Sequence, residues 1–200
     1  MGLCKVIGLS GKIGSGKTTT ANYLVELFGY TRLAFGDVLK RELSHKFGIP
    51  EELCYTRKDS MILTTELPRL RDPYPAKRMT VRELLQWYGT DYCRKYEPGY
   101  WVRRFLEEFD YVLSTDSMVV VEDVRFLNEA ECINRTLDGL MFRLEHYSHK
   151  RTPDAHRSET ELDNYKRFMR VFHPKYGNLK ACAIAIHDCV LNYNRYTMQI

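Results

Sequence analysis

Residues 3–18 read LCKVIGLSGKIGSGKT, and the rest of the chain is best interpreted outward from this stretch. The run Leu3–Ser10 is mostly apolar and ends at a glycine, which predicts a buried strand. The segment Lys17–Phe28 carries apolar residues near its end and is followed by Gly29, which predicts a helix with a glycine C-cap. Between them, Gly11–Thr18 matches the pattern G-x-x-x-x-G-K-[ST] at every position. The sequence therefore predicts a strand, a phosphate-binding loop and a helix in succession.

The residue types of this loop are those that phosphate binding requires. Glycines let the backbone curl so that successive N–H groups point inward, and the following helix adds its positive N-terminal end. Lys17 can reach the β- and γ-phosphates of ATP, and the Thr18 hydroxyl can bind Mg²⁺. The predicted nucleotide contacts are Gly11, Ile13, Gly14, Ser15, Gly16, Lys17, Thr18 and Thr19. The motif predicts nucleotide binding and leaves open what happens to the phosphate.

A second set of charged residues follows the apolar run Met118–Val121, which predicts another buried strand. In P-loop proteins an acid at the end of such a strand holds the Mg²⁺ shell, and Asp123 is our candidate. Arg125, two residues on, has a planar group that suits a phosphate. Glu122 precedes Asp123, whereas many P-loop ATPases have the Asp-Glu order, so transfer to a bound acceptor is favoured over hydrolysis. The alternative is an ordinary strand-end acid followed by a surface arginine.

Predicted strands and helices alternate along the chain. The expected strands are Leu3–Ser10, Tyr30–Phe35, Met118–Val121 and Leu140–Leu144, and the expected helices are Lys17–Phe28, Asp37–Phe47, Glu51–Tyr55, Thr80–Tyr96, Tyr100–Leu113, Phe126–Leu137 and Asn178–Asn194. This alternation predicts the α/β class, a P-loop NTPase fold with a parallel sheet and helices on both faces. Because no linker stands out, we expect residues 1–200 to form a single domain with inserted or lid-like segments.

Composition narrows the function further. The formal net charge of +4 suits a small anionic ligand and is too small to indicate nucleic acid by itself. No apolar run approaches the roughly 20 residues that a membrane span needs, and the N-terminus does not resemble a signal peptide, so we expect a cytoplasmic protein. The six cysteines form no CxxC pair, which is typical of buried, reduced thiols.

The segment Thr80–Tyr96 predicts the clearest helix. Thr80 and Glu83 have the spacing of a capping box. Opposite the apolar arc, four polar residues step by four along the helix: Arg82, Gln86, Thr90 and Arg94. Such a ridge could present two guanidinium groups and an amide to one ligand, and glutamine is suited to reading the edge of a base. The alternative is a solvated helix face.

Two other polar groups are candidates. Asp37 stands just past the second predicted strand, either as a helix N-cap or as a carboxylate near an acceptor, with Lys40 and Arg41 one turn along. Farther on, a basic stretch could close over phosphates as a lid, or it could be a solvated loop. Its candidate residues are Lys150, Arg151 and Arg157.

Several segments, in this order along the chain, resemble the bacteriophage deoxynucleoside monophosphate kinases of the nucleoside monophosphate kinase-like group. They are GKIGSGKTT (residues 11–19), LAFGDVLKREL (33–43), RELLQWYGTDYCR (82–94), Trp101, EDVRFLNEAE (122–131) and HRSE (156–159). The resemblance covers roughly residues 3–160. The chain is short for this family, and its C-terminal third matches no pattern of the family.

The resemblance implies transfer of the ATP γ-phosphate to a deoxynucleoside monophosphate with Mg²⁺, within deoxynucleotide biosynthesis. It implies acceptor binding by a helical segment at about 50–115 and a lid at about 146–165. The implied acceptor residues are Asp37, Arg41, Arg82, Gln86, Thr90, Arg94, Trp101, Asp123 and Arg125, with Lys150, Arg151 and Arg157 from the lid, and the implied catalytic residues are Lys17, Asp37 and Arg125.

Two other functions stay open at this point. One is another small-molecule P-loop kinase, such as a dephospho-CoA kinase. The other is a nucleotide-dependent switch or ATPase, against which the Glu122-Asp123 order and the lack of a basic tail count. The sequence allows a homodimer and names no macromolecular partner.

Overall fold

The computed structural model describes residues 3–145, 157–174 and 178–199. The chain divides into two compact units, one formed by residues 1–34 and 110–200 and the other by residues 35–109. We name them the sheet unit and the helical unit and describe each by itself. The predicted inserted segment, at about 50–115, overlaps the helical unit.

Among the described residues of the sheet unit, five strands form one sheet in the order β2-β5-β1-β6-β7, and every neighbouring pair is parallel. The strands are β1 (Val6–Ser10), β2 (Thr31–Leu33), β5 (Val119–Val121), β6 (Leu140–Leu144) and β7 (Phe168–Phe172). β1, β5 and β6 are buried at every position, as expected for strands covered on both faces. The predicted parallel sheet is confirmed, and β7 was not predicted.

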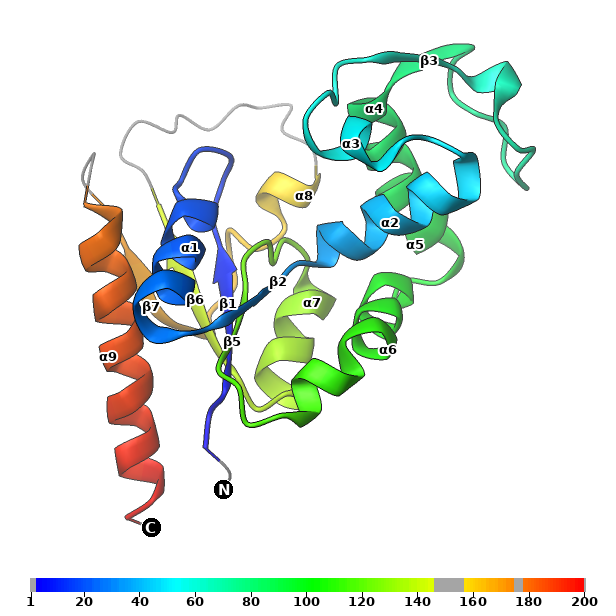
Figure 1. Ribbon diagram of the computed structural model, residues 1–200. Helices are drawn as coiled ribbons and strands as arrows, with labels where there is room; N and C mark the ends of the chain where they lie inside the picture. Colours follow the sequence, from blue (N-terminus) through cyan, green and yellow to red (C-terminus); the bar gives the residue numbers. More distant parts are fainter. Residues whose placement is uncertain (1–2, 146–156, 175–177, 200) are drawn as a thin grey trace. The chain divides into compact units, whose positions relative to one another are not determined.

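Helices cover both faces of this sheet (Figure 1). On one face, α1 (Lys17–Phe28) and α9 (Leu179–Thr197) lie side by side over Ile7 and Leu9 of β1. On the other face, α7 (Leu127–Glu131) continues as a π-helix, Cys132–Thr136, whose Ile133 packs close to Gly8. Successive side chains of a strand point to opposite faces, so Ile7 and Leu9 face one layer of helices and Gly8 faces the other. The short helix α8 (Arg157–Thr160) precedes β7.

The helical unit begins with α2 (Phe35–Phe47) and α3 (Glu51–Tyr55). A short antiparallel pair follows, β3 (Met61–Leu63) and β4 (Arg78–Thr80), with the 3₁₀ turn Thr64–Glu66 after β3. The unit continues through α4 (Val81–Gln86), a π-helix (Trp87–Tyr92) and α5 (Cys93–Tyr96) to α6 (Tyr100–Ser114). From the sequence, no strand was expected between residues 36 and 117, and the β3–β4 pair corrects that expectation.

Two sequence-based expectations about helices are revised. Thr80 caps α4 in a full capping box with Glu83, as predicted, but the helix from Thr80 to Tyr96 is not a regular α-helix, because its middle turn is π-helical. α2 begins at Phe35, so Asp37 lies in the first turn of the helix and is not its N-cap. A carboxylate in the first turn is still favourably placed against the helix dipole.

Candidate active site

The loop between β1 and α1 has the backbone that a phosphate cradle needs. Gly11, Gly14 and Gly16 have φ values of 147°, 76° and 91°, in the region that favours glycine. At Gly11 a Cβ atom would lie 2.3 Å from the carbonyl oxygen of Leu144, and at Gly16 it would lie 2.5 Å from the side chain of Leu179. The first and last glycines of the motif are therefore required by conformation and by space.

Lys17 lies inside this loop and is 8% exposed. Its Nζ donates hydrogen bonds to the carbonyl oxygens of Gly11 and Lys12, at 2.5 and 2.8 Å, and lies 3.4 Å from Ser15 Oγ. Burial, with Arg125 nearby, lowers the pKa of Lys17 from 10.5 to about 8. The ammonium group is thus positioned by the loop and is less well solvated than a surface lysine.

The other predicted loop residues take two positions. Ser15 is buried at 2% exposure, whereas Ile13, Gly14, Thr18 and Thr19 are exposed. Thr18 and Thr19 stand in the first turn of α1, which contains no acidic residue. Phosphate oxygens approaching this helix end would therefore meet N–H groups and hydroxyls without a repelling carboxylate in that turn.

The turn after β5 carries the second predicted group. β5 is the parallel neighbour of β1, so their carboxyl ends lie at the same edge of the sheet. Asp123 and Arg125 are each partly exposed in the turn between β5 and α7. The Glu129 carboxylate fixes this turn, because it accepts hydrogen bonds from the backbone N–H groups of Arg125 and Phe126, at 2.8 and 3.0 Å. The backbone of Arg125 is therefore fixed by α7, the helix that follows it.

Four charged residues of the site, Lys12, Arg143, Glu159 and Asp163, were not among the candidate site residues of the sequence analysis. Arg143, at the end of β6, is only 6% exposed, and its guanidinium donates to Asp163 at 2.6 Å, to the Leu162 carbonyl at 3.0 Å and to Glu145 at 2.7 Å. Lys12 of the loop also pairs with Asp163, at 3.0 Å. Glu159 of α8 accepts the Ile13 N–H at 3.0 Å and pairs with Arg125.

A pocket brings this site together within the sheet unit. It is lined by residues from β1, the loop, the β5 turn, β6 and α8, namely Ser10, Gly11, Val124, Arg125, Arg143, Ser158, Glu159 and Leu162. The sequence signals that could have found its new members are the arginine at the end of the apolar run 140–144 and the alternating acids at 159, 161 and 163.

In the helical unit, the predicted residues of α2 are paired within the unit. Asp37 pairs with Lys40 at 2.8 Å, and Lys40 also lies over the ring of Tyr55 at 4.0 Å. Arg41 pairs with Glu108 of α6 and lies 5.6 Å from the ring centre of Phe109. Both proposed acceptor residues of α2 are thus held by neighbouring side chains.

The polar ridge does not run straight along one helix face. Arg82 and Gln86 are exposed on α4, and Arg82 pairs with Asp59 at 3.3 Å. Thr90 and Arg94 follow across the π-helix and are partly buried. A π-helix has more residues per turn than an α-helix, so a four-residue step across it rotates away from the first two positions. The structure therefore separates the predicted ridge into two pairs.

Trp101 is 3% exposed, and its indole N–H donates to the carbonyl oxygen of Gly89 at 2.7 Å. Gly89 lies in the π-helix, where a Cβ atom would be 2.7 Å from the Leu39 side chain. The close approach of α2 explains why a glycine stands at this helical position, where a larger residue would not fit. Trp101 stabilises the π-helix from the core of the helical unit.

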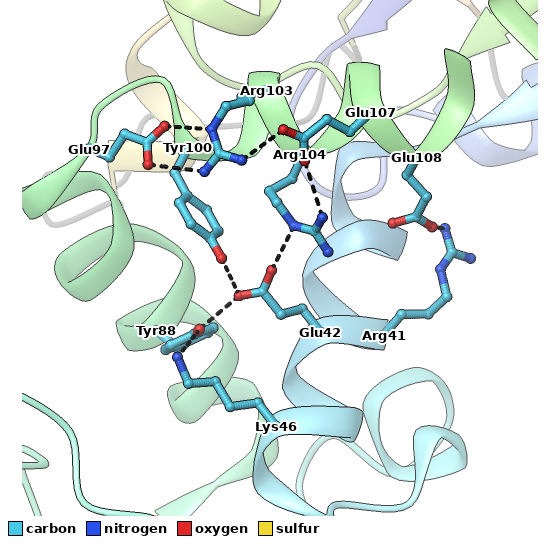
Figure 2. A network of polar contacts seen from close by, with 10 residues as sticks. All are labelled: Arg41, Glu42, Lys46, Tyr88, Glu97, Tyr100, Arg103, Arg104, Glu107 and Glu108. Atoms are coloured by element: carbon cyan, nitrogen blue, oxygen red, sulfur yellow. Dashed lines mark hydrogen bonds and ion pairs between the residues drawn. The ribbon is translucent and has the colours of Figure 1, made fainter. Parts of the chain in front are cut away.

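A carboxylate of α2 organises the same unit (Figure 2). Glu42 accepts hydrogen bonds from the hydroxyls of Tyr88 and Tyr100, at 2.8 and 2.7 Å, and from Arg104 Nε at 3.1 Å. Its side chain is 12% exposed. Burial raises the pKa of both tyrosines, so their hydroxyls stay protonated donors. Glu42 therefore joins α2, the π-helix and α6, and the sequence analysis did not identify it.

The predicted lid lies mostly outside the described residues, as do Lys150 and Arg151. Arg157, at the start of α8, is exposed and pairs with Glu161. Among the described residues, no helix is both long and apolar enough to cross a membrane. The same part of the chain has six free cysteines, of which five are buried and Cys189 is partly exposed.

Comparisons with known proteins identify the family of this chain. Residues 70–167 match the family model described as deoxynucleotide monophosphate kinase. A protein of Acanthamoeba polyphaga mimivirus named "Putative deoxynucleotide monophosphate kinase" is 33% identical over 173 residues, covering 82% of this chain and 84% of that protein. Adenylate kinase isoenzyme 1 of rabbit and of human are each 30% identical over 148 residues, covering 72% of this chain and 75% of theirs.

Among solved structures, a shikimate kinase from Acinetobacter baumannii in complex with shikimate matches with a TM-score of 0.49 and 15% identity, covering 95% of this chain and 94% of that one. The family assignment depends on the sequence relatives, since the mimivirus protein shares a third of its residues over most of both chains. With the phosphate loop and its buried lysine in place, the chain is a nucleoside monophosphate kinase-type phosphotransferase and belongs to the deoxynucleotide monophosphate kinase family.

Proposed function

We propose that this protein transfers the γ-phosphate of ATP to a deoxynucleoside monophosphate, giving the diphosphate and ADP. The observation that carries the proposal is the phosphate site of the sheet unit, where three positive-φ glycines surround buried Lys17 and where Arg125 shares the pocket with Gly11. Membership of the deoxynucleotide monophosphate kinase family supports the acceptor class. It does not favour a dephospho-CoA kinase or a nucleotide-dependent ATPase.

On the nucleotide side, we assign binding of the ATP phosphates to the loop N–H groups and Lys17. A buried cation of this kind stabilises charge on the transferring group in a site from which water is partly excluded. The Thr18 hydroxyl and the Asp123 carboxylate are oxygen ligands of the type that Mg²⁺ prefers, at one edge of the sheet, and fit a metal that would neutralise phosphate charge when bound. Arg125, with its planar fork, is assigned to a phosphate oxygen of the acceptor or of the transferring group.

On the acceptor side, the proposed residues of the helical unit are Asp37, Arg41, Arg82, Gln86, Thr90 and Arg94. Because the π-helix separates Arg82 and Gln86 from Thr90 and Arg94, we assign the two pairs to different parts of the acceptor. Trp101 is assigned a positioning role, because its buried indole holds the π-helix at Gly89. The acceptor's phosphate oxygen is already a nucleophile at neutral pH, so positioning and charge stabilisation suffice without a strong general base.

The direct test is ADP formation from Mg-ATP with each common deoxynucleoside monophosphate, the matching ribonucleotides and dephospho-CoA, alongside a reaction without acceptor. We expect ADP only with one or more deoxynucleoside monophosphates. ADP formed without any acceptor would indicate an ATPase, and ADP formed only with dephospho-CoA would indicate the other kinase. Either result would overturn the proposal.

Arg125 offers a sharper test of its assigned role. Arg125→Ala should raise the KM for the acceptor and lower kcat while changing the KM for ATP less. Arg135→Ala is a matched control, since Arg135 is an exposed arginine of the same unit whose partner is Glu131 on its own helix. The assignment fails if acceptor kinetics of a folded Arg125→Ala variant equal those of the control.

Five finer expectations belong to this proposal. A cytoplasmic location, a role in deoxynucleotide supply and the bacteriophage branch of the family remain predictions from the sequence. A homodimer and the absence of nucleic-acid binding are predictions as well. Size-exclusion chromatography with light scattering and a nucleic-acid binding assay test the last two.

A further inference from the structure

A short acidic segment, residues 157–163, lies against the phosphate site of the sheet unit. It carries carboxylates at every second position, Glu159, Glu161 and Asp163. Each has partners elsewhere in the unit, so the segment is attached at three points. Of these three carboxylates, Glu159 is the one that lines the pocket described above, together with Gly11 and Arg125.

The two partners of Glu159 are groups that the proposed function assigns to phosphate. Its Oε2 accepts the backbone N–H of Ile13, at 3.0 Å, and Ile13 belongs to the phosphate loop. Its Oε1 pairs with the guanidinium of Arg125. The Glu159 side chain is 16% exposed, so the pairing is shielded from solvent on most sides. A carboxylate with one oxygen on a loop N–H and the other on an arginine makes the contacts expected of a phosphate group.

The neighbouring acids hold the segment on either side of Glu159. Glu161 accepts the backbone N–H of Leu127 at 2.8 Å and pairs with Arg157. Asp163 accepts from buried Arg143 at 2.6 Å and from Lys12 at 3.0 Å. Glu159 is the acid of this segment that accepts the backbone N–H of Ile13, so the three acids have different roles. Glu161 and Asp163 anchor the segment, and Glu159 lines the pocket beside Gly11 and Arg125.

We propose that Glu159 is an internal competitor of the nucleotide phosphates, which must displace its carboxylate from Ile13 and Arg125 in order to bind. Phosphate and carboxylate cannot use the Ile13 N–H and the same face of Arg125 at once, and two anions in one pocket repel each other. The segment 157–163 thus restrains the site until a phosphate ligand arrives. The inference rests on phosphate binding by the loop, one part of the proposed function, and does not depend on the acceptor.

The test is equilibrium binding of Mg-ADP and of inorganic pyrophosphate, by calorimetry, to the wild-type chain, Glu159→Gln and Glu161→Gln. Glutamine keeps the size of the side chain and removes the charge that competes with phosphate. We expect Glu159→Gln to lower the Kd for both ligands about tenfold, the size expected when the hydrogen bond that must be broken is neutral and no longer charge-assisted. Glu161→Gln, two residues away, keeps an oxygen that can accept the Leu127 N–H and should stay within about twofold of the wild type.

The opposite sign would overturn the proposal. If Glu159 instead held Arg125 ready for the ligand, Glu159→Gln would weaken binding. An unchanged Kd, or an equal gain in Glu161→Gln, would also contradict competition at Ile13. Because no acceptor is present, these outcomes are independent of whether the chain phosphorylates deoxynucleotides.

A second measurement needs no variant. Amide hydrogen exchange of residues 157–163 in the wild-type chain should become faster when pyrophosphate is added, because displacement of Glu159 frees one of the three attachments. The turn contains amide hydrogen bonds that can report this, such as Glu161 N–H to the Arg157 carbonyl at 3.1 Å. Slower or unchanged exchange in this segment, with pyrophosphate bound, would refute the displacement.

Discussion

Replacing Lys17 by methionine should make the stability difference from the wild type depend on pH. The Lys17 side chain is buried, and burial lowers its pKa from 10.5 to about 8. Between these values the folded chain binds fewer protons at this side chain than the unfolded chain does. The free energy of unfolding of the wild type should therefore rise with pH across that window, relative to the variant.

The magnitude follows from the shift. Below the folded-state pKa, a charged Lys17 costs the folded chain roughly 3 kcal/mol relative to a hydrated lysine. At about pH 9.5 most of the folded population has a neutral Lys17, and the remaining cost is roughly 1.4 kcal/mol. The free energy of unfolding of the wild type, relative to that of Lys17→Met, should thus rise by about 2 kcal/mol between about pH 7 and about pH 9.5. Because Lys17 is only 8% exposed, little of this is lost to solvent screening.

Urea unfolding of both proteins at the two pH values measures this difference, and the other titrating groups, common to both chains, largely cancel. The same variant should retain no more than a few per cent of the wild-type kinase rate, since the proposed function assigns this ammonium group to the ATP phosphates. A stability difference that stays constant with pH, or that moves in favour of the variant as pH rises, would refute the reasoning about Lys17.

Three further substitutions test packing and hydrogen bonds within the two units. Gly11→Ala should destabilise the chain by about 1–3 kcal/mol and abolish ADP binding, because the new Cβ would meet the Leu144 carbonyl at a positive φ; wild-type thermal stability would contradict it. Trp101→Phe should cost about 1–2 kcal/mol in urea unfolding by leaving the Gly89 carbonyl without its indole donor; no loss would mean that the π-helix does not need this bond. Glu42→Ala should cost about 3 kcal/mol, because two tyrosine hydroxyls lose their carboxylate acceptor and Arg104 loses its less exposed partner while keeping its contact with Glu107. Glu107→Ala removes an exposed carboxylate that pairs with Arg103 and Arg104, and it should cost well under 1 kcal/mol; equal losses would remove the special role of Glu42.

The features that could be predicted from the sequence are those written in local patterns. The loop Gly11–Thr18 has a fixed spacing of residue types, and the structure gives its glycines the positive φ values that the motif requires. The apolar runs at 119–121 and 140–144 became buried parallel strands, and Thr80 with Glu83 formed the predicted capping box. Such features depend on residues within a few positions of one another, so a single chain reveals them.

Other elements have weak local signals. β3 and β4 are three residues each, too short for an alternating pattern, and they exist because they pair with each other. β7 has no fully buried position and is a strand because it pairs with β6 at the edge of the sheet. The π-helix Trp87–Tyr92 has no distinct residue pattern, and it is accompanied by the close approach of Leu39 to Gly89 and by the indole of Trp101.

The sequence by itself determined the phosphate loop, its lysine, the acid and arginine after β5, and four of the five strands of the parallel sheet. Only the tertiary structure decided that Arg143 is buried beneath Asp163, that Glu42 joins two tyrosines and an arginine, and that Glu159 contacts both Ile13 and Arg125. The physical reason is sequence separation. Glu159 lies 146 residues from Ile13 and 34 from Arg125, and only the folding of the sheet brings their charges and hydrogen-bonding groups into contact.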